Sequence, residues 1–182
     1  MTNQEKVFKA AIPYLVMNPT ASIEAIAASA SISKATFHRT FESRDVFFNQ
    51  MADYAIETLK YALDQNTFSA LESRVLHAVE ILVAHGDKVS FLYNFSHEHN
   101  FDTLNQKLRH ELALYYKDIE QAYDQGVLNQ EVPLVMLEDA IHALVSNAWV
   151  QVHMQNVTYK QAFSAIKAIM YGGIVHETDH NK

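Results

Sequence analysis

Apolar residues recur every three or four positions along most of the chain, which is the spacing of one face of an α-helix. Near the N-terminus the pattern is carried by Val7, Phe8, Ala11, Ile12 and Leu15. Serines or a proline precede several of the periodic segments, as is usual where helices begin. The pattern predicts an all-α protein of about nine helices, at residues 4–17, 22–30, 33–40, 43–64, 68–85, 87–97, 101–125, 133–154 and 158–171.

The predicted helices divide the chain into two unequal parts. Three short helices fill the N-terminal segment, and longer helices fill the remainder. We therefore expect an N-terminal three-helix domain at residues 1–48 and a larger helical bundle at residues 49–182.

The composition of the 182 residues excludes several classes of protein. Apolar residues make up 49% and charged residues 19%, which is typical of a chain that folds. The 4 glycines and 3 prolines are too few for the many turns of an all-β protein. Without cysteine there is no disulfide, thiolate metal site or cysteine nucleophile. No stretch has the pattern of a leader or a membrane span, so we expect a cytoplasmic protein with no membrane partner.

The net charge of −7 is unevenly distributed. Residues 1–50 carry five basic and four acidic side chains, whereas the other 132 residues carry nine basic and 17 acidic ones. A near-neutral N-terminal domain can approach a polyanion while an acidic body stays away from it.

Residues 22–48 have the pattern of a helix-turn-helix unit. In its second helix, Ile32, Phe37 and Phe41 fall on one face and would point into the core. A short helix with small and polar outward residues fits the major groove of DNA. The alternative is a small three-helix unit whose outward residues are only solvated. The outward residues are Lys34, Ala35, Thr36, His38, Arg39 and Thr40.

This segment resembles the helix-turn-helix of the TetR family of transcriptional repressors, from about residue 7 to residue 50. The match lies in Ser22-Ile23, Ile26-Ala27, Ile32-Ser33-Lys34, Phe37-His38, Phe41 and Ser43-Arg44-Asp45. Beyond it, only the length, the helical pattern and the segment 123–128 resemble the family.

The sequence departs from the family pattern at a few positions. Ser31 and Ala35 stand where the family usually has glycine, and His38 replaces a tyrosine that contacts phosphate. Neither missing glycine matters if the backbone keeps a negative φ there. We therefore expect an intact fold with modest affinity for phosphate.

The resemblance implies DNA-contacting roles for nine residues. Lys34, Thr36, His38 and Arg39 would meet the groove and its rim, with Ala35 and Thr40 beside them, while Ser22, Ser33 and Arg44 would meet phosphates. The guanidinium fork of Arg39 matches O6 and N7 of guanine. The alternatives for Arg39 are a phosphate contact or an ion pair with Glu42.

The resemblance also implies a homodimer that binds a pseudo-palindromic operator and an inducer pocket in the larger domain. The dimer interface would use Ala143, Val150, Met154, Phe163, Ile166 and Met170, and the alternative is that these residues are buried within one chain. The pocket would use Phe95, Tyr116, His142 and Trp149, for which the alternative is ordinary core packing.

Other functions find little support in the sequence. It has no nucleophile elbow, phosphate loop, dinucleotide-binding turn or zinc-protease motif, so we expect no enzyme activity. The candidate metal ligands are His97-Glu98-His99, the pair Asp139 and His142, and the pair Glu177 and His180, and we expect no metal site or cofactor there. The sequence thus predicts a ligand-responsive repressor of DNA transcription with an unidentified small-molecule inducer. The alternative is a helical protein that binds a small molecule and no DNA.

Overall fold

The computed structural model describes residues 2–98 and 101–172, and all of its secondary structure in these ranges is α-helical. Within them, no helix is long and apolar enough to cross a membrane. The helices are α1 (Asn3–Met17), α2 (Ile23–Ser29), α3 (Lys34–Thr40), α4 (Arg44–Asp64), α5 (Leu71–Ala84), α6 (Gly86–Glu98), α7 (Phe101–Glu111), α8 (Ala113–Asp124), α9 (Leu134–His153) and α10 (Tyr159–Gly172).

Serine side chains cap α2, α3 and α4. The Oγ atoms of Ser22, Ser33 and Ser43 accept hydrogen bonds at 3.2, 3.1 and 3.1 Å from the backbone N–H groups three residues later. Each bond satisfies a donor that the first turn of a helix leaves free. The starts of α2, α3 and α4 therefore lie where the serines predicted them.

The single helix predicted at residues 101–125 is wrong, because the helix is interrupted at Leu112. Buried positions continue at the same spacing on both sides of the break, so the apolar pattern does not reveal it. The two halves have different neighbours: α7 packs on α4 and α6, whereas α8 packs on α5 and α9. The bend allows both contacts and raises the number of described helices from nine to ten.

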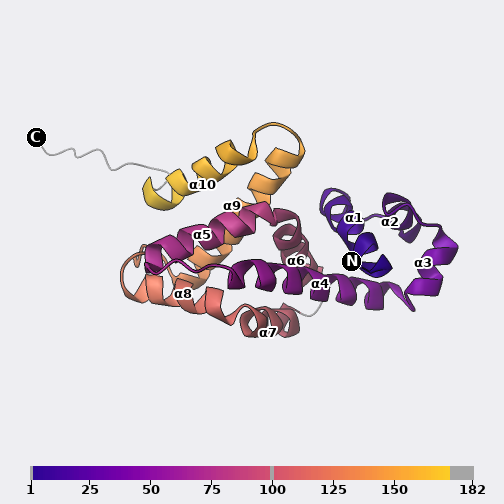
Figure 1. The fold of residues 1–182 in the computed structure, drawn as a ribbon, viewed down its shortest axis with the longest axis horizontal. Coiled ribbons are helices and arrows are strands. Elements are labelled where there is room, and N and C mark those ends of the chain that lie inside the picture. Colours follow the sequence, from indigo (N-terminus) through magenta and orange to yellow (C-terminus); the bar gives the residue numbers. More distant parts are fainter. Residues whose placement is uncertain (1, 99–100, 173–182) are drawn as a thin grey trace, which may run out of the picture.

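The molecule is elongated, with a small head of α1, α2, α3 and the start of α4 at one end (Figure 1). The remaining helices form the body, in which α5, α6, α8 and α9 pack together and α10 lies on the outside against α9 and α5. The 21-residue helix α4 runs without interruption from the head into the body. The boundary predicted after residue 48 therefore falls inside a continuous helix, and two domains stay a prediction.

Four aromatic rings form the centre of the head. Phe47 is fully buried, and its ring centroid lies 4.7 Å from those of both Phe37 and Phe41 and 5.9 Å from that of Phe8. Phe37 and Phe41 come from α3 and its end, so the cluster fixes how α3 is rotated. The inward face of α3 is therefore the one that the sequence predicted.

In the body, α6 and α9 approach each other without an intervening side chain. A Cβ atom added to Gly86 would lie 2.6 Å from the Cβ of Trp149. Real Cβ atoms do not come so close, so only glycine allows this contact.

We expect Gly86→Ala to lower the free energy of unfolding by about 1–3 kcal/mol, because the added methyl group overpacks the α6–α9 contact. Urea denaturation measures the change. In a Trp149→Gly background the same substitution should be close to neutral, since the opposing Cβ is gone. An equal loss of stability in both backgrounds would contradict the close-approach explanation.

Candidate DNA-binding face and ligand cavity

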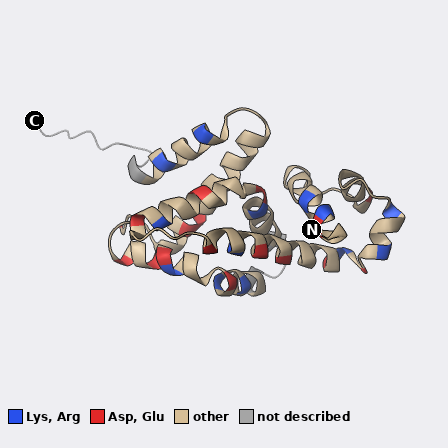
Figure 2. Cartoon of the chain, viewed as in Figure 1, with Lys and Arg blue, Asp and Glu red and all other residues tan. Residues whose placement is uncertain are grey.

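The outer face of α3 carries the residues predicted to contact DNA. Phe37 is buried, whereas Ala35 and Arg39, on the opposite side of the helix, are exposed, as are Lys34 and His38. Basic residues lie on α3 at the outer tip of the head, and acidic residues concentrate in the body (Figure 2). The structure thus brings small and cationic side chains together on one convex surface.

Two of the predicted residues use their hydroxyl groups within the helix. The Oγ1 of Thr40 donates to the carbonyl oxygen of Thr36 at 2.8 Å, and Thr40 is half-buried. The Oγ1 of Thr36 lies 3.0 Å from the Oγ of Ser33. Thr40 therefore offers its methyl group more readily than its hydroxyl to a partner, while Ser33 serves first as the cap of α3.

Lys34 has a partner that sequence reasoning missed. Its Nζ forms an ion pair with a carboxylate oxygen of Glu24, in the first turn of α2. The hydrogen bond from Lys34, the backbone N–H of Glu24 and the hydroxyl of Ser22 lower the pKa of Glu24 to about 2. Glu24 is therefore ionised at neutral pH, and a DNA phosphate would have to compete with it for Lys34. A glutamate ten residues before a lysine has no fixed helical relation to it, so no sequence signal pointed to the pair.

The two arginines of the head differ in how they are held. Arg39 is exposed, and among the described residues it has no ion-pair or hydrogen-bond partner, which removes the predicted alternative of a pair with Glu42. Arg44 lies with its guanidinium 4.9 Å from the ring centroid of Phe48, and its Nη1 is 3.4 Å from the carbonyl oxygen of Ala21. Arg39 is thus available to a ligand, whereas Arg44 also ties α4 to the α1–α2 connection.

The turn between α2 and α3 has the left-handed backbone that the missing glycine would favour. Ser31 has a φ of 57°, so the negative φ under which the missing glycine would not matter is not found at this position. The Ser31 N–H donates to the Ala28 carbonyl at 2.9 Å and the Ile32 N–H to the Ala27 carbonyl at 3.0 Å. This pair of bonds is a Schellman motif, whose left-handed residue is usually glycine. The hydrogen bonds of the helix end therefore hold Ser31 in a conformation that costs an L-residue about 1 kcal/mol.

We expect Ser31→Gly to raise the free energy of unfolding by about 0.5–1 kcal/mol, because glycine adopts a positive φ without the steric cost of a Cβ. The matched control is Ser29→Gly, in the last turn of α2, which should lower stability since a helical glycine is unfavourable. Urea midpoints of both variants test the expectation. A destabilised Ser31→Gly protein would show that the turn is not strained.

A cavity of about 280 Å³ lies in the body between α4, α5, α6, α7, α8 and α9. Most of its wall is aliphatic or aromatic, and most of its charged groups come from α7 and α9. Two residues predicted for the pocket, Tyr116 and His142, line it. The other lining residues are Leu59, Leu82, Val89, Leu92, Tyr93, Asn105, Leu108, Arg109, Leu112, Tyr115, Val135, Glu138 and Asp139.

The polar side of the cavity is built around Glu138, which is only 4% exposed. One of its oxygens, Oε2, accepts a hydrogen bond of 2.5 Å from Nη2 of Arg109, whose guanidinium also lies 4.6 Å from the ring centroid of Tyr116. Its other oxygen, Oε1, is buried and has no hydrogen-bond partner among the described residues. Burial raises the pKa of Glu138, against the lowering effect of Arg109. Sequence reasoning missed Glu138 because a lone glutamate on a helix is usually solvated.

Three further titratable groups of the cavity, His142, Tyr115 and Tyr116, have pKa values shifted toward their uncharged forms. Burial lowers the pKa of His142 and so favours its uncharged imidazole. Burial also raises the pKa of Tyr115, and raises that of Tyr116 to about 12. The phenol oxygen of Tyr115 lies 3.4 Å from Nε2 of His142. The cavity therefore offers neutral hydrogen-bonding groups beside one buried carboxylate.

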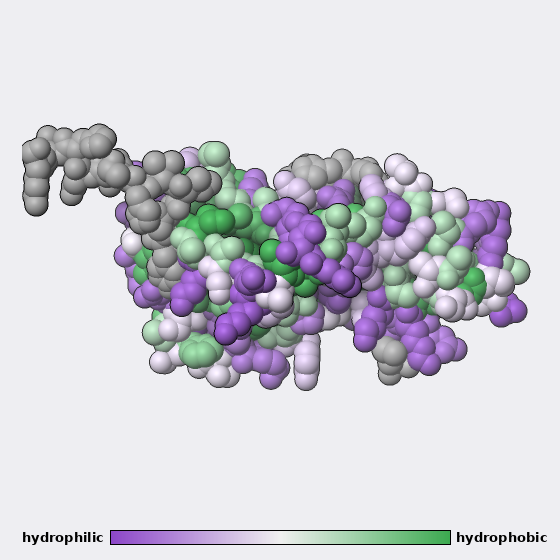
Figure 3. All heavy atoms as spheres, turned by 90° about the horizontal axis from the view of Figure 1, so that it is seen from above, coloured by the Kyte–Doolittle hydropathy of each residue, from purple (hydrophilic) through white to green (hydrophobic). Residues whose placement is uncertain are grey.

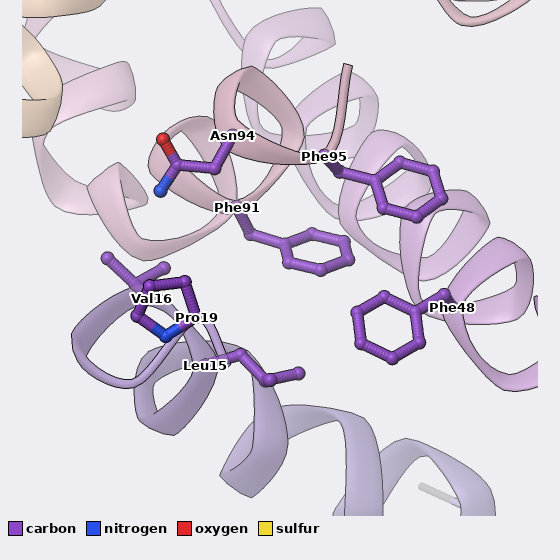
Figure 4. Close-up of a pocket in the computed structure, with 7 residues that line it drawn as sticks. All are labelled: Leu15, Val16, Pro19, Phe48, Phe91, Asn94 and Phe95. Carbon is purple, nitrogen blue, oxygen red and sulfur yellow. The ribbon is translucent and has the colours of Figure 1, made fainter. Parts of the chain in front are cut away.

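Phe95 and Trp149, also predicted for the pocket, do not line this cavity. Phe95 and Phe91 lie on the face of α6 that meets the head, where a space of about 30 Å³ separates them from α1 (Figure 4). Trp149 lies further along α9, where its ring stacks on His153 at 4.7 Å. The position of Phe95 on α6 and that of Trp149 on α9 thus direct both rings away from this cavity.

The residues predicted for a dimer interface divide into three groups. Ala143 and Met154 are exposed, and Val150, Phe163 and Met170 are half-buried. Ile166 is only 2% exposed and packs into the core of its own chain, which agrees with the stated alternative of burial within one chain, and the interface itself stays a prediction. Seen from above, hydrophobic residues gather on the surface around α9 and α10 (Figure 3).

The predicted metal ligands do not assemble in the part of the chain that the structure describes. In that part no three His, Asp or Glu residues are grouped to hold a metal ion. Asp139 and His142 both line the cavity. The cluster His97-Glu98-His99 and the pair Glu177 and His180 lie outside the described side chains.

No protein-family model matches the chain, and no curated protein is significantly similar to it. Solved structures are similar in fold. The TetR-like regulator LfrR from Mycobacterium smegmatis, in complex with proflavine, is 18% identical with a TM-score of 0.70, over 95% of this chain and 96% of that one. A TetR-like regulator from Rhodococcus sp. RHA1 is 19% identical with a TM-score of 0.65, over 94% of each chain. The regulator PfmR from Thermus thermophilus is 14% identical with a TM-score of 0.62, over 94% and 97%. The chain therefore has the fold of the TetR-like transcriptional regulators.

Proposed function

We propose that the protein is a sequence-specific DNA-binding regulator of transcription, and specifically a repressor. The observation that supports this most directly is the outer face of α3, where Arg39, unpaired among the described residues, projects beside small residues from a helix of seven residues. The N-termini of α2, α3 and α4, which lie at Ser22, Ser33 and Ser43, would present backbone N–H groups to phosphates. The regulators that share the fold support the same function, and none of those compared is described as an enzyme.

We further propose that two copies associate through α9 and α10. The apolar contacts would come from exposed and half-buried residues of these helices. They are Ala143, Val150, Met154, Phe163 and Met170. A two-fold dimer places its two α3 helices on successive turns of DNA and so requires a pseudo-palindromic operator. Sedimentation velocity should show a dimer in the absence of DNA.

The cavity would hold an inducer. LfrR, which shares the fold, has been crystallised with proflavine. Two helices connect such a site to the head: α4 carries Leu59 at the cavity and Phe47 in the head, and α6 carries Leu92 at the cavity and Phe91 against α1. A ligand that shifts either helix changes the position of α3, so ligand and operator would weaken each other's binding by the same factor.

The proposal is tested by selection from a library of random DNA duplexes, a method that works while the operator is still unidentified. We expect enrichment of an inverted repeat. In fluorescence anisotropy the enriched duplex should bind far more tightly than a scrambled duplex of equal length. Raising the salt from about 50 to about 200 mM should weaken binding by about 10³-fold or more if the dimer contacts six or more phosphates.

Failure to enrich any sequence, with equal and weak binding to both duplexes, would exclude a sequence-specific regulator. The alternative function, a helical protein that binds a small molecule without DNA, would then be the better account of the cavity.

A further inference from the structure

The cavity contains a buried acceptor atom that nothing in the described chain satisfies. Oε1 of Glu138 is inaccessible to solvent and has no hydrogen-bond partner, although Oε2 is paired with Arg109. A buried carboxylate oxygen without a donor is costly, because it has lost its water and gained nothing in return. Glu138 lines the cavity, so a turn of its carboxylate toward the cavity would let an occupant supply the missing donor.

The charges around the cavity indicate which charge the missing hydrogen-bond donor should carry. Glu138 and Asp139 contribute two carboxylates to the wall, and Arg109 contributes one cation. Arg109 is also shared, since its Nη1 lies 3.8 Å from Oε1 of Glu120. His142 adds no charge at neutral pH, because burial lowers its pKa. The wall therefore has an excess of negative charge, which favours a positively charged donor over a neutral one.

The rest of the wall indicates the shape of the occupant. Tyr93, Tyr115 and Tyr116 line the cavity together with leucines from α4, α5 and α6. One of these rings already accepts a cation on its face, since the Arg109 guanidinium lies 4.6 Å from the centroid of Tyr116. A volume of about 280 Å³ accommodates a body of two or three fused rings or its aliphatic equivalent.

We propose that the ligand of this cavity is a small amphipathic cation, an apolar and preferably aromatic body with one protonated amine, and that the amine donates to Oε1 of Glu138. Release of DNA on ligand binding would follow only if the proposed function is correct. The preference for a cation depends on the cavity alone, so this preference is measured without DNA.

The test uses three probes of the same shape and different charge. They are 2-naphthylmethylamine, a cation at neutral pH, the uncharged 2-naphthalenemethanol, and the anion 2-naphthoate. Isothermal titration calorimetry measures their binding to the full chain. We expect the amine to bind about ten- to hundred-fold more tightly than the alcohol, since it makes a charge-assisted hydrogen bond to the carboxylate. The naphthoate should bind more weakly than the amine by at least the same factor.

Two variants separate Glu138 from the general acidity of the body. Glu138→Gln removes the charge but keeps an oxygen that can accept from Arg109, so the amine should lose its advantage while the alcohol binds as before. Glu120→Gln is the matched control, because it removes a charge next to the same arginine but outside the cavity lining. It should leave the preference for the amine intact.

Equal binding of the three probes to the wild-type protein, a preference for naphthoate, or binding of none of them would overturn the inference. These wild-type measurements decide the matter even if Glu138→Gln does not fold. A protein that prefers the amine but fails to select a DNA sequence would retain the cation site and lose the proposed regulatory function.

Discussion

Replacing Phe47 by alanine is expected to lower the free energy of unfolding by about 3–5 kcal/mol, since the ring is fully buried. The loss should be concentrated in the head, because three of the rings that Phe47 contacts, Phe8, Phe37 and Phe41, belong to α1, α3 and the end of α3. A loss of that size is a large fraction of the stability of a small domain. The orientation of α3 depends on the same contacts, so DNA binding should be lost at temperatures where the body is still folded.

Hydrogen exchange measures this effect amide by amide. Protection should fall in α1, α2 and α3 and persist in α8 and α9. The control is Phe68→Ala, which removes the same atoms from a side chain that is 52% exposed, and it should cost less than about 1 kcal/mol. If Phe47→Ala reduced protection equally in head and body, the two parts would unfold together. Residues 1–48 would then not be a separate domain.

The second large effect is expected from Arg39→Ala. A bidentate contact between arginine and guanine contributes about 1–3 kcal/mol, and a dimer would lose two of them. Binding to the selected operator should therefore weaken by about 30-fold or more, while binding to scrambled DNA changes little. A base contact is indicated by this loss of discrimination, whereas a phosphate contact would weaken binding to both duplexes alike.

Lys34→Ala supplies the comparison for the case in which its side chain meets the phosphates at the rim of the groove rather than a base. It should weaken binding to both duplexes and make the salt dependence shallower by about one unit for each phosphate interaction that the substitution removes. The control is Lys60→Ala, which removes a lysine paired with Asp64 in the body and should leave DNA binding unchanged. If Arg39→Ala left discrimination intact, α3 would not be the reading helix.

Much of the head could be predicted from the sequence because its signals are local. A serine cap acts over three residues, and Phe37 and Phe41 are four apart on one helix, so the starts of the helices and the outer face of α3 followed directly. The φ of Ser31 did not follow from its residue type, since a positive φ is unfavourable for serine and the hydrogen bonds of the helix end impose it here.

The features that depend on contacts between distant helices could not be predicted in this way. The break at Leu112 arises because α7 and α8 pack on different neighbours, and the apolar spacing continues through it. Tyr116 and His142, chosen for the pocket by residue type, line the cavity, whereas the position of Phe95 on α6 directs its ring to the head. A signal for Glu138 did exist: it lies four residues before His142 on a largely apolar helix, so the two share a face.

The length of the continuous helix α4 determines how far a small tilt in the body would move the head. Its 21 residues correspond to a rod of about 32 Å, with Leu59 beside the cavity and Phe47 in the head. A rod of this length that tilts by about 5° moves its far end by about 3 Å. That distance is close to the roughly 3.4 Å between neighbouring base pairs. Under the proposed function, a lever of this length would convert a displacement smaller than one side chain at the cavity into a misalignment of about one base-pair step at the groove.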